Sequence, residues 1–194
     1  LPLAQVLEDA TRRRRRAQGM LDDHGSDAVR YWAASSRLGT DAAFDPQSPK
    51  QIKIGRRLAI KVLNAAKFVY SFEGETGEIT EALDLDMLNI LSGVVEQATR
   101  AYEAYDHARA LELAETFFWT FTDDYLELVK DRAYTGSGAP RTSAVTALRL
   151  ALDTLLRLFA PVIPFATEEV WSWTHESSIH TSTWPAVAEL VTTG

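Results

Sequence analysis

The stretch KQIKIGRRLAIKVLNAAKF, residues 50–68, carries six lysines and arginines and no acid, although the chain has a formal net charge of −7. Apolar residues recur there, and just beyond, at intervals of three and four. They are Ile54, Leu58, Val62, Ala65, Val69 and Phe72. This spacing predicts a helix with one buried face. The segment is therefore expected to bury one side and to expose positive charge on the other.

The basic side chains of this helix share one side. At about 100° per residue they fall within an arc of about 140°. This cationic stripe consists of Lys50, Lys53, Arg56, Arg57, Lys61 and Lys67, and Asn64 and Phe68 lie in the same arc. The stripe would attract phosphates, the ring would offer a stacking surface for a base, and the amide could read a base edge. The alternative is a solvated helix face with Phe68 in the core.

The rest of the chain also has mainly helical periodicity. Helices are expected at residues 26–36, 84–109, 111–131, 145–159 and 165–171, with loops at 39–49, 73–77 and 135–140. Ser26 and Asp27 resemble N-cap residues. The fold class predicted is all-α, an antiparallel bundle of four long helices preceded by a smaller helical element. We place the smaller element in residues 1–45 and the bundle in residues 46–194.

Composition narrows the functional classes. The 194 residues include no cysteine, which excludes disulfides and thiolate metal sites. The four histidines are scattered and show no metal-ligand spacing, so a metal site is not expected. No apolar run reaches membrane-spanning length, and no signal peptide is visible. A cytoplasmic protein is the expectation. The chain begins at Leu1 without methionine, so a fragment, a processed product and an engineered piece of a longer protein all remain open.

Several stretches resemble the valyl-tRNA synthetase family, especially its actinobacterial members. The family-like stretches are GSDAVRYWAASSRLGTDAAFD (25–45), GRRLAIKVLNAAKF (55–68), FFWTFTDDYLELVKDR (117–132), LFAPVIPFATEEVW (158–171) and SIHTSTWP (178–185). The last three also occur, in looser form, in the isoleucine and leucine enzymes. The resemblance covers roughly residues 19–186.

The resemblance implies a stem-contact element near residues 27–32 and, after it, the helical anticodon-binding domain that docks the anticodon stem and loop of tRNA. The partner implied is therefore tRNA, valine-specific by resemblance. The family's basic helix ends in Asn-x-x-x-Phe, which matches Asn64 and Phe68. Phe68 is thus the strongest candidate for contact with an anticodon base. Leu126 and Lys130, on a helix that lies across the same groove in the family, are weaker candidates.

The catalytic features of that family are missing from this sequence. A Lys-Met-Ser-Lys-Ser loop should precede the stretch MLDDHGSDA, but LEDATRRRRRAQG stands there, and neither a His-Ile-Gly-His signature nor an editing domain is found. We expect no catalytic residue and no cofactor in this chain, since ATP and Mg belong to the intact enzyme. The prediction is a tRNA-binding module of a valine–tRNA ligase. The alternative is a catalytic-domain-free paralogue that acts as a protein-interaction or regulatory module.

Two further charged segments allow competing interpretations. The run Arg12–Arg16 could grip RNA phosphates or form a solvated arm. Asp123, Asp124 and Glu127 form an acidic helix patch, which could bind a metal or pair with Arg132 or another basic side chain.

Overall fold

The computed structural model describes residues 18–39, 49–73 and 76–190. Its main elements are α2 (Ser26–Ala34), α3 (Lys50–Tyr70), α4 (Ala82–Glu103), α5 (His107–Thr120), the π-helical turn η1 (Phe121–Tyr125), α6 (Leu126–Thr135), α7 (Gly138–Phe159), α8 (Pro164–Trp171) and the 3-10 turns η2 (Ile179–Thr181) and η3 (Val187–Glu189). Residues 18–24 are also helical. Within these ranges there is no strand, which confirms the all-α prediction.

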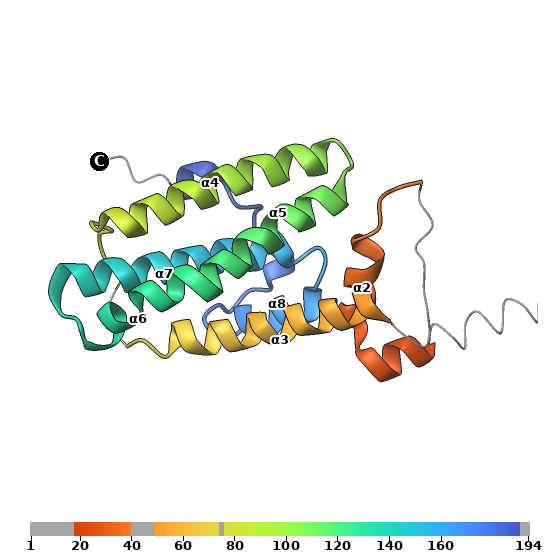
Figure 1. The fold of residues 1–194 in the computed structure, drawn as a ribbon, viewed down its shortest axis with the longest axis horizontal. Coiled ribbons are helices and arrows are strands. Elements are labelled where there is room, and N and C mark those ends of the chain that lie inside the picture. The colour runs from red at the N-terminus through yellow and green to blue at the C-terminus, as the bar shows by residue number, and fades with distance from the viewer. Residues whose placement is uncertain (1–17, 40–48, 74–75, 191–194) are drawn as a thin grey trace, which may run out of the picture.

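Four long helical segments run antiparallel: α3, α4, the rod made of α5, η1 and α6, and α7 (Figure 1). Helix α7 is the central one, because it packs against α3, α4, α5, α6 and α8. Its apolar residues surround most of its circumference, which is typical of a helix in the middle of a bundle. Phe118, Phe121 and Phe159 are among the largest fully buried side chains, and the rings of Phe118 and Phe159 meet edge to face, with centroids 5.5 Å apart.

Helix α4 ends earlier than its periodicity predicts. Instead of continuing to residue 109, it stops at Glu103, and Tyr105 adopts φ = 60°. The amides of Tyr105 and Asp106 donate to the carbonyls of Tyr102 and Ala101, which is the hydrogen-bond pattern of a Schellman C-terminus. Asp106 then caps α5 by accepting a hydrogen bond from the Arg109 amide. Glycine or asparagine usually occupies this left-handed position, and a bulky residue there is unusual. Because the position holds tyrosine, the sequence contained no local signal for the end of α4.

The turn η1 joins α5 to α6 and gives Tyr125 an inward position. Its hydroxyl donates to Asp84 Oδ1 at 2.8 Å. The fully buried Asp84 carboxylate also accepts from Ser143 Oγ at 2.6 Å and from both terminal nitrogens of Arg132, at 2.8 and 2.6 Å. This network ties α4, η1, α6 and α7 together, and it satisfies a charge that would otherwise be costly to bury.

Ser26 and Asp27 do not cap α2 as predicted, and Asp27 instead links α2 to the rest of the bundle. The N-cap of α2 is Gly25, with no side-chain cap, and Ser26 already lies inside the helix. The Asp27 carboxylate instead accepts from the backbone amides of Phe165 and Ala166, at 3.1 and 2.7 Å, and so caps α8. A carboxylate at a helix N-terminus complements the helix dipole.

A close approach between α2 and α3 completes this docking. A Cβ atom at Gly55 would lie 2.5 Å from Tyr31 Cβ, so only glycine fits there. The predicted division between residues 45 and 46 falls outside the described residues and stays a prediction. None of the helices in the described ranges is both long and apolar enough to cross a membrane.

Candidate nucleic-acid interface

Helix α3 buries the predicted face with one exception. Leu58, Val62, Ala65, Val69 and Phe72 are buried, as expected. Ile54, however, is 39% exposed, so its assignment to the core was wrong. The reason is that α2 packs against the side of α3 that carries Gly55, and Ile54 lies beside the cationic stripe.

The cationic stripe is exposed along most of its length. Lys50, Lys53, Arg56, Arg57 and Lys67 are all exposed. Among the residues that the structure describes, no carboxylate lies within ion-pair distance of Lys50, Lys53, Arg56 or Lys67. The side chains therefore form a run of positive charge along one side of a 21-residue helix that has no acid of its own. Such a run suits the regularly spaced phosphates of a nucleic-acid backbone.

Two members of the stripe are held by the neighbouring rod. Lys61 Nζ lies 2.9 Å from Asp123 Oδ1 on η1, and the hydrogen bond between them is the main cause that lowers the pKa of the Asp123 carboxyl. Arg57 Cζ lies 5.1 Å from the centroid of the Trp119 ring, a cation–π distance. Lys61 is thus half-buried and partly neutralised, in contrast to its neighbours on the stripe.

Phe68 and Asn64 occupy different environments. Asn64 is exposed, so its amide is available. Phe68 is half-buried, and its ring packs edge-on against Phe72 and Tyr134, with centroid distances of 5.0 and 5.6 Å. One side of the ring joins the core cluster, and the rest stays accessible. Its contact with a base remains a prediction.

The weaker candidates on α6 differ from each other. Leu126 is only 6% exposed and belongs to the core, so its side chain presents no surface to a ligand and this candidate is withdrawn. The candidate came from the family resemblance alone, and in this chain α6 buries Leu126 together with Val129 and Ala133. Lys130 is half-buried and forms an ion pair with Glu127, which raises the pKa of the Lys130 ammonium.

Two carboxylates of the acidic patch pair with lysines. Asp123 pairs with Lys61 and Glu127 with Lys130, so pairing with basic side chains is confirmed. Arg132 is not one of these partners, because it turns inward to the buried Asp84. That residue lies 48 positions away in the sequence, and no local pattern linked the two. The run Arg12–Arg16 lies outside the described residues.

Two aromatic residues lie near the cationic stripe, although no sequence motif pointed to them as parts of a binding site. Trp119 is half-buried and lies beside Arg57. Tyr134 is 54% exposed and extends the cluster formed by Phe68 and Phe72. Both come from the α5–α6 rod, so only the packing of that rod beside α3 brings them to the stripe.

The fold and its basic helix define a class of protein. Residues 84–193 match the family model described as the anticodon-binding domain of tRNA ligase, and the chain belongs to that family. Among its relatives are valine–tRNA ligases. It is 64% identical over 174 residues to that of Leifsonia xyli, and 57% identical over 175 and 179 residues to those of Thermobifida fusca and Salinispora arenicola.

The matches cover most of this chain and a small part of each relative. The alignments include 88 to 89% of this chain but only 20% of each of the three ligases, so the chain spans about a fifth of their length. A solved structure with the same fold is that of an Agrobacterium radiobacter LeuRS in a ternary complex with tRNA and LeuAMS. It has a TM-score of 0.62 and 19% identity, and the match covers 89% of this chain and 21% of that one. At that identity it supports the fold alone.

Proposed function

We propose that this chain binds the anticodon stem and loop of tRNA and contributes tRNA recognition to a valine–tRNA ligase. The observation that carries the proposal is the exposed cationic stripe of α3. Phosphate contacts made by such a stripe position an RNA and supply most of the affinity, while a few other side chains read the bases.

The residues beside the stripe suit base recognition. Asn64 offers both a donor and an acceptor, and it is exposed on α3. Phe68 and Tyr134 form an edge-to-face pair at the same end of the helix, and stacking on such rings is worth roughly 1–3 kcal/mol per base. Single-stranded loops, whose bases can unstack, are the usual targets of this chemistry in RNA.

The choice of valine tRNA rests on the relatives. The three relatives described above are named valine–tRNA ligases, and they are 57 to 64% identical to this chain over most of its length. In a whole ligase, binding at this domain would help to hold the acceptor end of the tRNA at a distant active site. ATP and Mg would act in that catalytic part, and the role of this chain would be binding.

Fluorescence anisotropy with labelled anticodon hairpins tests the proposal. The 194-residue chain should bind the hairpin of valine tRNA, bind the hairpin of leucine tRNA more weakly, and lose affinity as salt increases. A Phe68→Leu variant should reduce the preference for the valine hairpin while keeping the salt dependence. A chain that binds neither hairpin at low salt would contradict the proposal and would favour the protein-interaction module.

A further inference from the structure

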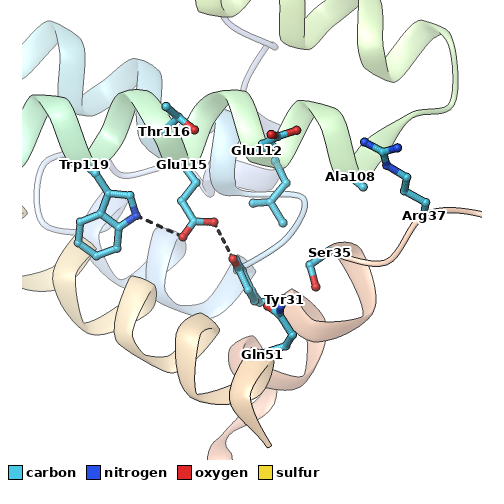
Figure 2. Close-up of a pocket in the computed structure, with 10 residues that line it drawn as sticks. Tyr31, Ser35, Arg37, Gln51, Ala108, Glu112, Glu115, Thr116 and Trp119 are labelled. Carbon is cyan, nitrogen blue, oxygen red and sulfur yellow. Dashed lines mark hydrogen bonds between the residues drawn. The ribbon is translucent and has the colours of Figure 1, made fainter. Parts of the chain in front are cut away.

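A cleft of about 480 Å³ lies where α2 and α3 meet α5, beside the N-terminal half of the cationic stripe. Tyr31 and Ser35 line it from α2 and its C-terminus, Gln51 from α3, and Glu112, Glu115 and Trp119 from α5 (Figure 2). Its volume is within the usual range for pockets that take a small molecule or one group of a larger ligand. Gln51 belongs to the same helical turn as Lys50 and Lys53, so the cleft opens next to exposed positive charge.

The indole of Trp119 is held in one orientation by a chain of hydrogen bonds. Trp119 Nε1 donates to Glu115 Oε1 at 3.2 Å, and the Tyr31 hydroxyl donates to Glu115 Oε2 at 2.6 Å (Figure 2). Burial, followed by the contact with Glu115, raises the pKa of Tyr31 above its ordinary value, so the hydroxyl keeps its proton. One oxygen of Glu115 thus accepts a hydrogen bond from Trp119 on its own helix, α5, and the other accepts one from Tyr31 on α2. These bonds fix the indole ring before any ligand arrives.

The ring is also placed against the stripe. Arg57 Cζ lies 5.1 Å and Lys61 Nζ 6.0 Å from its centroid. An aromatic ring next to cations is the combination that proteins use to bind single-stranded nucleic acid, because the ring stacks on a base while the cations meet the adjoining phosphates. A ring that is already fixed loses little conformational entropy when it binds.

We propose that this cleft takes one unstacked base of the bound RNA, with Trp119 as its stacking wall and Arg57 on the adjoining phosphate. This inference rests on the proposed function and adds a second contact region, at the opposite end of α3 from Phe68. Glu115 and Tyr31 act as positioning residues through Trp119. Glu112 at the rim is exposed, and its Oε2 pairs with Arg109 Nη1 at 2.9 Å. Its Oε1 would accept a hydrogen bond from an exocyclic amino group, so adenine, cytosine or guanine would bind better than uracil.

A coupling experiment tests the inference. Affinities of the wild-type chain and of Trp119→Leu are measured for the valine anticodon hairpin and for a set of hairpins with one abasic nucleotide at each loop position. If one base enters the cleft, Trp119→Leu lowers affinity for the intact hairpin about 5- to 150-fold. At one abasic position it lowers affinity no further, because the partner of the ring is already absent. Trp119→Phe should restore most of the affinity, since it keeps a ring.

The control is Trp173→Leu, which removes an exposed indole near the C-terminus of α8. It should leave every hairpin affinity unchanged, and thermal unfolding checks that all variants fold. An equal loss for every hairpin with Trp119→Leu, or no loss, would overturn the inference while salt-dependent binding by the wild type keeps the proposed function. If the wild type bound no hairpin, both proposals would fall.

Discussion

Lys61 Nζ on α3 lies 2.9 Å from Asp123 Oδ1 on the π-helical turn of the neighbouring rod. The contact crosses from a helix without acids to the one turn of the rod that carries two adjacent aspartates. It neutralises one cation in the middle of the stripe and leaves Lys50, Lys53, Arg56 and Lys67 exposed on both sides. Asp123 therefore competes with a phosphate for the Lys61 ammonium.

Asp123→Asn should strengthen RNA binding. An exposed ion pair of this kind is worth about 0–1 kcal/mol, so release of Lys61 should raise hairpin affinity up to about fivefold at low salt. The matched control is Asp124→Asn, which makes the same change of charge at the next position. In the part of the chain that the structure describes, Asp124 makes no ion pair. Equal gains for both variants would show that overall charge, and not the Lys61 contact, sets the effect.

Gly55→Ala should destabilise the docking of α2. The added methyl would lie 2.5 Å from Tyr31 Cβ, and overpacking of this kind typically costs about 1–3 kcal/mol. Gly93→Ala is the matched control within α4, where nothing lies within 4 Å of the new Cβ atom, and it should stabilise by about 0.5–1 kcal/mol. Urea unfolding measures both. A stabilised Gly55→Ala variant would show that α2 is not packed as described.

Asp84→Asn should lower the free energy of unfolding by about 3 kcal/mol, because it leaves the Arg132 guanidinium without its carboxylate. Arg132 is partly exposed, which places the expected cost at the low end for a buried pair. Asp86→Asn, an exposed carboxylate one half-turn along the same helix, should change stability by less than about 0.5 kcal/mol. Similar unfolding midpoints for the two variants would contradict the role given to the Asp84 network.

Tyr105→Gly should stabilise the fold by about 1 kcal/mol, since glycine adopts φ = 60° without the cost paid by a side chain with a Cβ. Tyr105 is 81% exposed, so little packing is lost. The control is Glu103→Gly, two residues before Tyr105 and still within α4, which should destabilise by about 1 kcal/mol. Thermal unfolding distinguishes them, and a destabilised Tyr105→Gly would mean that the tyrosine ring makes a stabilising contact.

Periodicity and charge in the sequence were enough to predict the four-helix architecture and the exposed stripe, because both depend on residues three and four apart on single helices. Contacts between helices could not be predicted from these local patterns. Asp27 caps a helix whose capped amides lie 138 and 139 residues away, and Arg132 turns to Asp84 across the bundle. The π-helical turn likewise has no simple sequence signature. Leu126 was a candidate through the family resemblance alone, and the structure buries it in the core.

The salt dependence of hairpin affinity tests the central claim most directly. For the wild type, log Kd should rise linearly with log salt concentration. Lys53→Gln and Arg56→Gln should each reduce that slope by about one, while Arg100→Gln, an exposed arginine on α4, should leave it unchanged. A slope that stays the same in the two stripe variants, or that falls equally in all three, would contradict an RNA backbone bound along α3.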